Sequence, residues 1–501
     1  MSIAIPLWPF VTVTLAIIII FVLDSHRRKR HYPPGPKPRL FVGNLFDIPT
    51  IEPWKVYNDW RKFYGALIHL EIIGYHIVVV NSRTLADRML EKRSKIYSDR
   101  PFIPMMDLMG WTTLNTALLR YGPDWRMHRR LYKQGFRAAV VPDYQPILFS
   151  KADQFSSNLR QSPDSFVAHT RTYAAATILA TVYGYDISPS NDKLVEIAEQ
   201  AAATSSDSFH PSSVVVNVLP FLRHLPLRFP IFAFQRIARR TRRILNEMRK
   251  LPYEFVKNDM VTGKDNFSLL AKFLEKHTVN GGDDHQEDLI RNALTTAYAA
   301  GAETTSSVLV TFFLAMGLHP DIQKRAQREI DTVIGNRQFP SYATDYSNLP
   351  YVEAILRETL RWSPVTPLGI PHTAFLDDTI DDYFIPKGTT VISNIWAMTR
   401  DESVYPEPES FNPDRFLTED RACNEDEVLV AFGFGRRACA GRHFAVLTLR
   451  TAMAAILSQF EIGQPEDEAG TPIKSLADVK YSDGLISQPS HFRCVIKPRT
   501  K

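Results

Sequence analysis

The stretch FGFGRRACAGR, Phe432 to Arg442, places one of only three cysteines of a 501-residue chain in a basic loop that glycines interrupt. Gly433, Gly435 and Gly441 allow the backbone to bend tightly and to approach a flat ligand, because glycine has no Cβ. The segment AGRHFAVLTLRTAMAAIL, directly after Cys439, has helical periodicity. We therefore expect the sulfur at a helix N-terminus, where unpaired N–H groups favour the thiolate over the thiol.

A thiolate in this loop can be a nucleophile or a metal ligand. A nucleophilic cysteine needs a nearby base, and the sequence offers no clear candidate. The flanking cations Arg436, Arg437 and Arg442 suit an iron porphyrin, with the sulfur on the iron and an arginine on a propionate. The competing interpretation is a small buried hydrophobic side chain, which is the usual role of an isolated cysteine.

The composition is that of a globular protein with a large core, since 45% of the residues are hydrophobic and 23% are charged. The net charge of +5 is mild, and no stripe of lysine and arginine alternates with aromatic residues, so nucleic acid is not indicated as a partner. Cys423, Cys439 and Cys494 lie far apart without a C-x-x-C motif, which argues against a zinc site or a disulfide framework. Reduced cysteines fit a reducing compartment.

The N-terminus predicts a membrane anchor. Ile3 to Leu23 is apolar apart from two threonines, and as a helix it would span about 30 Å, the thickness of a bilayer core. Four cations at 27–30 follow directly, and they favour an orientation in which this end of the anchor lies on the cytosolic side. A cleaved signal peptide would carry its positive charge before the apolar run, whereas here the charge follows it. The other alternative is a helix buried in the core of the protein. We expect an anchor over 1–23, a basic and proline-rich linker over 24–38 and one domain over 39–501.

Helical periodicity dominates the rest of the chain, so the expected fold class is mainly α with small β-sheets. Ala66 to Ser82 predicts two strands around Gly74-Tyr75, and further short strands are expected from His372 to Val391. Residues 236–260 predict a charged amphipathic helix, and Asn280 to Asp288 a polar loop.

A buried helix is predicted from Asp288 to Leu318, and it contains AGAETT, Ala300 to Thr305. Gly301 in a helix interior costs about 1 kcal/mol relative to alanine. A buried Glu303 costs more unless it is paired or hydrogen-bonded. Two unfavourable choices side by side indicate function or strain, and a threonine hydroxyl can bond a ligand instead of the helix backbone. The alternative is a back-bonded threonine beside a buried ion pair.

The cysteine loop fits the pattern F-x-x-G-x-R-x-C-x-G. The matching residues are Phe432, Gly435, Arg437, Cys439 and Gly441. This pattern resembles the haem-binding signature of the cytochrome P-450 superfamily, with Ala440 where the family often has proline. The resemblance implies the fold of that family, a single haem domain that is mainly α, and it makes Cys439 the axial ligand of the haem iron.

The same resemblance implies roles for other motifs. AGAETT is similar to the oxygen-binding helix of the family, in which Thr304 would hold water and dioxygen over the iron and Glu303 would feed protons. WRMHRR is similar to the W-x-x-x-R helix of the family, in which Trp125 and Arg129 would bond haem propionates. His372 matches a position that reaches the other propionate; a surface strand histidine is the alternative.

LPYVEAILRETLRWSP, Leu349 to Pro364, has an apolar face at helical spacing and predicts an amphipathic helix. Glu358 and Arg361 are i, i+3 neighbours, which without further partners would be a surface pair worth about 0.2–0.5 kcal/mol. The resemblance implies that both lock onto Arg415 of FNPDRF and form a structural triad that holds the cysteine loop.

As a whole, the resemblance implies a microsomal monooxygenase that inserts one oxygen atom of O2 into a lipophilic small molecule, such as a terpenoid of fungal secondary metabolism. The cofactor would be haem b. Electrons would come from NADPH through a cytochrome P-450 reductase, with cytochrome b5 as a second candidate donor. The enzyme would lie in the endoplasmic reticulum membrane with its catalytic domain in the cytosol.

Two surfaces are predicted for this activity. The first is a basic face that would attract an acidic partner, and an ordinary solvated face is the alternative. Its residues are Arg126, Arg129, Arg130, Lys133 and Arg442. The apolar segments 104–111, 365–369 and 484–486, with Tyr298, would line the substrate pocket. Alternative functions are a reductase-independent haem-thiolate isomerase or dehydratase, and a non-catalytic membrane haem protein.

Overall fold

A computed structural model describes the protein over most of its length. The described residues are 31–188, 191–207, 211–224, 233–335, 345 and 348–500. The predicted anchor over 1–23 and the cations at 27–30 lie outside them, so both stay predictions.

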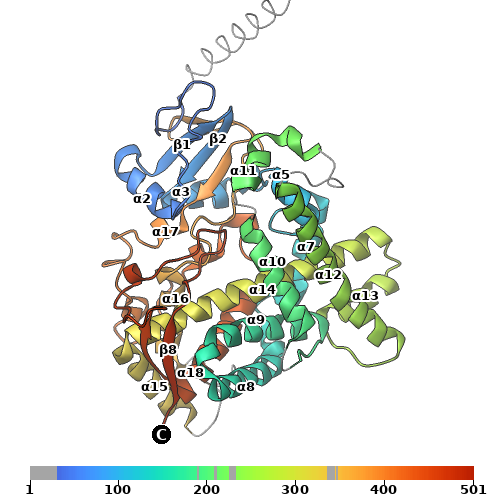
Figure 1. Ribbon diagram of the computed structural model, residues 1–501, viewed down its shortest axis with the longest axis vertical. Helices are drawn as coiled ribbons and strands as arrows, with labels where there is room; N and C mark the ends of the chain where they lie inside the picture. Colours follow the sequence, from blue (N-terminus) through green and yellow to red (C-terminus); the bar gives the residue numbers. More distant parts are fainter. Residues whose placement is uncertain are drawn as a thin grey trace, which may run out of the picture.

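Helices make up most of the described chain and surround one long central helix, α14 (Asp284–Leu318) (Figure 1). The other helices of eight or more residues are α2 (Pro53–Tyr64), α7 (Pro123–Phe136), α8 (Gln145–Gln161), α9 (Phe166–Tyr183), α10 (Lys193–Asp207), α11 (Pro211–Val218), α12 (Ala233–Val261), α13 (Leu269–Val279), α15 (Pro320–Ile334), α16 (Pro350–Trp362) and α18 (Arg442–Gln459). The shorter turns are α3 (Arg83–Ala86), η1 (Asp87–Lys92), α4 (Ser94–Tyr97), α5 (Pro104–Met109), α6 (Trp111–Leu114), η2 (Val141–Tyr144), η3 (Pro163–Ser165), η4 (Pro220–His224), α17 (Ile395–Met398), η6 (Pro413–Phe416), η7 (Leu429–Phe432), η8 (Gly435–Arg437) and η9 (Leu476–Asp478).

The central helix begins four residues earlier than expected. The Asp283 carboxylate accepts a hydrogen bond from the Gln286 backbone N–H at 2.8 Å, so Asp283 caps the helix and residues 284–288 form its first turns. The prediction of a polar loop up to Asp288 is therefore wrong in its second half. Among the described residues, α14 alone is long and apolar enough to cross a membrane, yet it lies inside the protein as the predicted buried helix.

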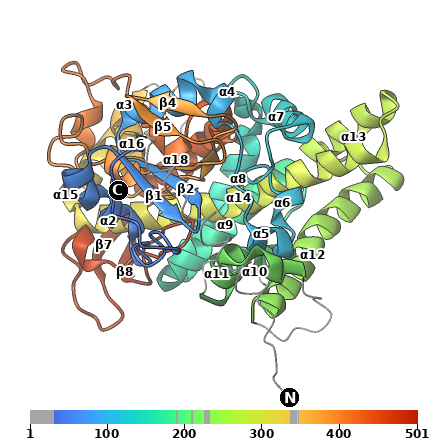
Figure 2. The ribbon, with the colours of Figure 1, turned by 90° about the horizontal axis from the view of Figure 1, so that it is seen from above.

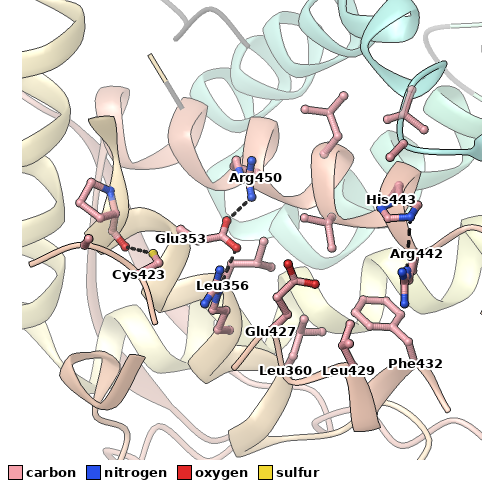
Figure 3. A pocket seen from close by; sticks show the side chains of 17 residues that line it. Glu353, Leu356, Leu360, Cys423, Glu427, Leu429, Phe432, Arg442, His443 and Arg450 are labelled. Atoms are coloured by element: carbon pink, nitrogen blue, oxygen red, sulfur yellow. Dashed lines mark hydrogen bonds and ion pairs between the residues drawn. The ribbon is translucent and has the colours of Figure 1, made fainter. Parts of the chain in front are cut away.

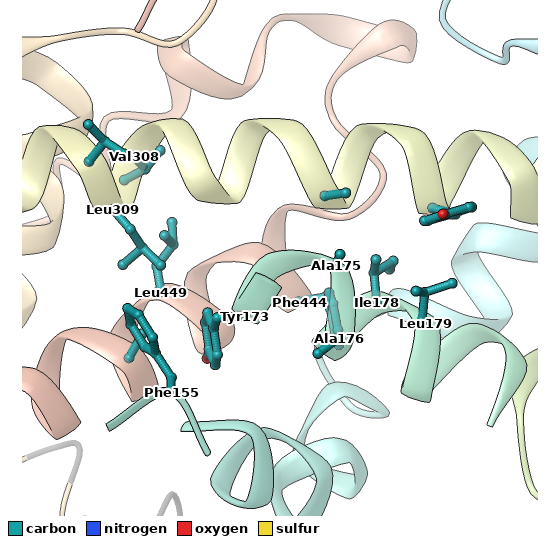
Figure 4. Packing of buried hydrophobic residues seen from close by; sticks show 14 of the residues in the cluster. Phe155, Tyr173, Ala175, Ala176, Ile178, Leu179, Val308, Leu309, Phe444 and Leu449 are labelled. Atoms are coloured by element: carbon teal, nitrogen blue, oxygen red, sulfur yellow. The ribbon is translucent and has the colours of Figure 1, made fainter. Parts of the chain in front are cut away.

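The core is formed where α8, α9 and α18 pack around α14 (Figure 4). Leu309 of α14 points toward Leu449 of α18, and both are buried. Tyr173 of α9 is buried between these helices, and its hydroxyl donates to the Thr448 carbonyl at 2.9 Å. The polar group of Tyr173 is thus satisfied inside the apolar core.

Three small sheets accompany the helices, which confirms the predicted fold class for the described residues. The largest has the order β1-β2-β6-β3 and lies at one end of the molecule (Figures 1 and 2). The strands are β1 (Leu67–Ile72), β2 (Tyr75–Val80), β3 (His372–Thr373), β4 (Asp378–Ile380), β5 (Tyr383–Ile385), β6 (Thr390–Ser393), β7 (Phe460–Glu466) and β8 (Arg493–Pro498). The predicted hairpin is confirmed as β1 and β2, and β2 pairs in parallel with β6 from Ile77↔Thr390 onward.

The described part of the proline-rich linker lies on this sheet. Tyr32 stacks on His69 and His76, with ring centroids 4.9 and 5.1 Å away. The His69 N–H donates to the Pro34 carbonyl at 2.9 Å. At Gly35 an added Cβ would meet the His69 carbonyl oxygen at 1.9 Å, so only glycine allows this close approach. The described part of the linker, 31–38, is not helical and is packed against β1.

Candidate active site

The cysteine loop connects η7 to α18 and is fixed from two sides. The Cys439 N–H donates to the Phe432 carbonyl at 2.7 Å, which closes the loop. The Gly435 N–H donates to the Glu91 carboxylate at 2.6 Å. Gly435 has φ +56°, and an added Cβ would lie 2.1 Å from the Leu90 carbonyl oxygen. Gly435 therefore lets the loop rest against the backbone of η1.

The Cys439 side chain is exposed, yet protein surrounds it closely enough for burial to raise the pKa of its thiol. Exposure combined with this burial indicates that the side chain borders a space inside the protein. The Gly441 N–H and the charges of Arg129 and Arg442 lower that pKa, but by less than burial raises it. The helix-start and arginine effects expected from the sequence are thus present, but burial outweighs them, so the protein alone does not favour the expected thiolate. A metal ion on the sulfur would reverse this balance, since a coordinating thiol is deprotonated outright.

One face of α14 also borders open space. Ala297, Ala300, Gly301 and Thr304 follow helical spacing and are exposed or half-buried, whereas Tyr298 and Ala302 are buried. Tyr132 of α7 donates its hydroxyl to the Ala293 carbonyl of α14 at 2.7 Å, and Arg129 of α7 donates to the Ala438 carbonyl of the cysteine loop at 2.8 Å. Helix α7 therefore lies close to both α14 and the loop.

Gly301 has a packing reason. An added Cβ would lie 3.0 Å from Ile178 Cγ1 of α9, so glycine allows α9 and α14 to pack closely. The close packing of α9 and α14 therefore gives a structural reason for glycine at this position, despite its cost in a helix.

Glu303 and Thr304 differ in how their polar groups are satisfied. The Thr304 hydroxyl donates to the Ala300 carbonyl at 2.8 Å, which is the back-bonded alternative considered above. Glu303 is half-buried, and burial raises the pKa of its carboxyl to about 7. Among the described residues it has no ion-pair partner, so the buried ion pair of that alternative is not formed.

We predict that Glu303→Gln raises the free energy of unfolding relative to the unchanged protein, and that this gain grows as pH rises. The folded pKa of about 7 exceeds the ordinary value of 4.5, so between these pH values only the unfolded chain has released the proton, and stability falls. Glutamine carries no such proton. The gain in unfolding free energy should be absent at pH 4 and reach up to about 3 kcal/mol at pH 8. Thermal unfolding at matched haem loading measures it, and an equal effect at both pH values would contradict it.

A cluster of arginines lies beside the loop without carboxylates of its own. Arg437 donates to the carbonyls of Ser98 at 2.7 Å and Leu119 at 2.8 Å, and its guanidinium lies 4.5 Å from the Trp125 ring centroid. Arg129 donates to the Ala438 carbonyl at 2.8 Å.

Arg100 completes this cluster. It is buried and donates to the Ile370 carbonyl at 2.6 Å and the Pro371 carbonyl at 2.7 Å. Among the described residues, none of Arg100, Arg129 and Arg437 forms an ion pair. Burial lowers the pKa of all three, that of Arg437 to about 10. The nearby Asp99 is already bound to Arg120 through two bonds of 2.8 and 2.9 Å. The cluster thus carries uncompensated positive charge and suits an anionic ligand.

His372 is buried on β3, which excludes the surface-histidine alternative. Its Nδ1 lies 2.7 Å from the Tyr97 carbonyl, so Nδ1 carries the proton and Nε2 is an acceptor. Burial, and then the charge of Arg100, lower the pKa of His372. As it stands the ring accepts at Nε2, and it would donate there to a carboxylate only after an anion had raised this pKa.

The three residues of the expected triad meet in the interior. Arg361 donates to the Glu358 carboxylate through two bonds of 2.6 and 2.8 Å, and both side chains are fully buried. Arg415 lies 3.3 Å from the same carboxylate. The Asn412 N–H adds a bond of 2.7 Å, which joins α16 to the chain just before η6. The alternative of an exposed surface pair is excluded for Glu358 and Arg361.

These residues fit an iron porphyrin. The accessible Cys439 sulfur would ligate the iron, and Arg100, Arg129 and Arg437, which form no ion pair with described residues, would donate to the two carboxylates of the porphyrin.

The comparison with known families decides the identity. A family model of cytochrome P-450 matches residues 33–484.

The chain belongs to the cytochrome P-450 family.

Similar fungal proteins support the predicted enzyme class. Cytochrome P-450 monooxygenase ple1 of Rhodocybe pseudopiperita is 37% identical over 501 residues, covering 98% of this chain and 94% of the relative. Cytochrome P-450 monooxygenase COX1 of Coprinopsis cinerea is 37% identical, with 97% of this chain and 96% of the relative covered. Cytochrome P-450 monooxygenase claR of Ampulloclitocybe clavipes is 36% identical, with 97% of this chain and 90% of the relative covered. The P-450 monooxygenase class predicted from the sequence is thereby confirmed, and a P-450 implies haem and O2.

A pocket of about 430 Å³ lies next to the P-450 cysteine loop, between α16, α18 and residues 422–432 (Figure 3). Phe432 and Arg442 contribute to its wall, and Glu353 bridges Arg357 at 3.0 Å and Arg450 across it. Cys439, Glu303 and Thr304 do not line this pocket, so it is separate from the candidate haem site.

The segments predicted to line the P-450 substrate pocket are partly brought together. The Ser487 N–H donates to the Val365 carbonyl at 2.8 Å, and the Ser307 hydroxyl of α14 donates to the Ser487 carbonyl at 3.1 Å. Tyr298 is fully buried and its hydroxyl donates to the Leu194 carbonyl, so this group is already occupied.

Arg100 was not predicted from the sequence as a residue of the candidate site. It lies in SDRP, Ser98 to Pro101, directly before α5. No local periodicity distinguishes a buried arginine from a surface one. One sequence feature could have indicated it: the proline that follows Arg100 restricts the backbone of a loop next to the methionine-rich segment 104–109.

Proposed function

We propose that this P-450 monooxygenase holds haem b, oxidises a lipophilic small molecule such as a terpenoid, and receives electrons from NADPH through a membrane-bound reductase. The observation that carries the proposal is the Cys439 sulfur, which is accessible inside an enclosed space beside unpaired arginines. When bound, the haem supplies the activation of dioxygen and the transfer of one oxygen atom to the substrate. The residues of the chain bind this group, orient the substrate and move protons.

Glu303 has the properties of the proton source for this reaction. With a pKa of about 7, its carboxyl holds a proton in part of the molecules at neutral pH and can exchange it. The Thr304 hydroxyl donates to the Ala300 carbonyl and keeps its oxygen lone pairs for a water or a ligand on the open face of α14.

We predict that Thr304→Ala uncouples NADPH consumption from product formation. Positioned proton transfer contributes about 100-fold or more to a rate, so product formed per NADPH should fall at least about tenfold while NADPH is still consumed. Thr304→Ser retains the hydroxyl and is the matched control. Full coupling in the alanine variant would contradict the role of Thr304, and full function without NADPH would favour the isomerase or dehydratase instead.

The proposed reductase would meet a basic face. Arg126, Arg130 and Lys133 are exposed on α7 and form no ion pair with described residues. Arg129 does not belong to this face, because it is half-buried and donates to Ala438 of the cysteine loop. Three unpaired cations so near the loop favour an acidic partner, for which cytochrome b5 is the second candidate.

A substrate screen tests the proposal as a whole. The full chain is co-expressed with a reductase and supplied with terpenoids, polyketides and aromatic compounds, and products are identified by mass. We expect products heavier by one oxygen atom that require NADPH. The predicted anchor, Ile3 to Leu23, would place the enzyme in the endoplasmic reticulum membrane with the catalytic domain in the cytosol.

A further inference from the structure

The pocket between α16, α18 and residues 422–432, here called the α16–α18 pocket, is not used by the proposed chemistry (Figure 3). Its volume of about 430 Å³ lies within the range of small-molecule sites, which is about 300–1,000 Å³. The apolar part of its wall includes Val141, Leu356, Leu360, Phe432, Val446 and Leu447. A pocket of this size and lining can enclose the apolar body of a small molecule.

The charged groups of the α16–α18 pocket leave positive charge in excess. Glu353 is bridged by Arg357 at 3.0 Å and by Arg450, so its carboxylate is already compensated. Glu427 is exposed, and Arg442 forms no ion pair with any described residue. Three arginines therefore line the pocket together with two glutamates. This balance favours a ligand with a single negative charge over a neutral ligand or a polyanion.

Arg442 is the group that can receive this negative charge. Its Nε donates to His443 Nε2 at 3.3 Å. Burial, and then the charge of Arg442, lower the pKa of His443, so the ring is neutral near pH 7 and can accept this bond. The terminal nitrogens of Arg442 form no hydrogen bond with described residues. They provide a fork that fits the two oxygens of a carboxylate.

Cys423 and Arg442 lie at opposite ends of the α16–α18 pocket, with Glu353 and Leu356 between them (Figure 3). The Cys423 thiol is half-buried and lies 3.4 Å from the Pro350 carbonyl. A ligand that pairs with Arg442 therefore covers Cys423 only if it is elongated.

We propose that the α16–α18 pocket binds an elongated lipophilic monocarboxylate, with the carboxylate on Arg442 and the apolar chain directed along α16 and α18 toward Cys423. An inorganic anion would pair with Arg442 but would leave the apolar wall in water, and a neutral lipophile would leave the arginine without a counter-charge. The pocket is separate from the site at Cys439, so the inference does not depend on which substrate the enzyme oxidises.

Alkylation of Cys423 in the haem-loaded full chain reports whether the pocket is filled. Cys439 is held on the iron in that state, and Cys494 is buried, which raises the pKa of its thiol to about 12. N-ethylmaleimide should therefore react at Cys423, and the adduct seen by intact mass should be absent in Cys423→Ala. At a decanoate concentration ten times its dissociation constant, few pockets are empty, so the adduct should form about tenfold more slowly.

Matched compounds and variants separate the charge from the chain. Butyrate has the carboxylate without the long chain, and 1-decanol has the chain without the charge, so neither should protect Cys423 at the decanoate concentration used. Arg442→Gln removes a charge-assisted hydrogen bond and should raise the decanoate concentration for half protection about tenfold or more. Arg421→Gln removes an exposed cation outside the pocket and should leave that concentration unchanged.

The inference is overturned if decanoate gives no protection, or if butyrate or 1-decanol protects equally well. These comparisons use the unchanged chain, so they decide the matter even if Arg442→Gln does not retain haem. Equal effects of Arg421→Gln and Arg442→Gln would also overturn it.

A second measurement separates the pocket from the haem site. 4-Phenylimidazole, followed by its own change of the Soret band, occupies the haem site, and the protection of Cys423 by decanoate should persist. Protection that disappears under this condition would place decanoate at the haem and would overturn the inference.

Discussion

Cys439→Ala is expected to eliminate the monooxygenase activity and the spectral signature of a sulfur-ligated haem. The sulfur is the accessible group of this loop that can ligate iron, and alanine leaves no ligand in its place. The loop itself should persist, because its closing bonds, from Cys439 N–H to Phe432 and from Gly435 N–H to Glu91, come from the backbone. The reduced protein under carbon monoxide should lose the red-shifted Soret band, and product formation should fall to the level without enzyme.

Cys423→Ala is the matched control. Cys423 is half-buried beside the separate pocket, where its thiol lies 3.4 Å from the Pro350 carbonyl. Its removal should leave the spectrum unchanged. A normal sulfur-type spectrum in Cys439→Ala would disprove the assignment of the axial ligand.

The second large effect is expected from Glu358→Ala. This substitution removes the one carboxylate of the buried triad and leaves two arginines, Arg361 fully buried and Arg415 nearly so, without their counter-charge. Breaking a buried ion pair costs about 3–5 kcal/mol. A typical domain is stable by about 5–15 kcal/mol, so the yield of folded, haem-containing protein should drop severely.

The loss is measured as the midpoint of denaturant unfolding and as haem content per chain. Glu402→Gln, at an exposed acid of the same region, should change stability by less than about 0.5 kcal/mol. If Glu358→Ala folds and retains haem as well as this control, the triad does not hold the structure together.

The sequence predicted those parts of the fold that rest on local periodicity. The hairpin of β1 and β2, the central helix and the helices α16 and α18 follow from side-chain spacing within each segment. The early start of α14 was missed although Asp283 and Gln286 form a capping pattern. The parallel pairing of β2 with β6 joins segments some three hundred residues apart, and no local pattern encodes such a contact.

The site shows the same division. Cys439, Glu303 and Thr304 were found through short motifs, and the structure adds their surroundings. Whether burial or cations control the Cys439 thiol depends on residues from several elements, and that balance could not be read from the loop alone. The carbonyl partners of Arg100 and Arg437 also come from distant segments, and tertiary structure alone brings them together.

The three glycines of the cysteine loop differ in whether the surrounding protein leaves room for a side chain. A library of variants could use this difference. At 435 any side chain collides with Leu90, and at 433 the φ of +78° disfavours one, whereas an added Cβ at 441 meets no protein atom within 4 Å. Saturation mutagenesis that selects for folding should therefore reject changes at 435 and tolerate alanine at 441. Selection for pigment would then reveal, at 441 alone, the footprint of the prosthetic group.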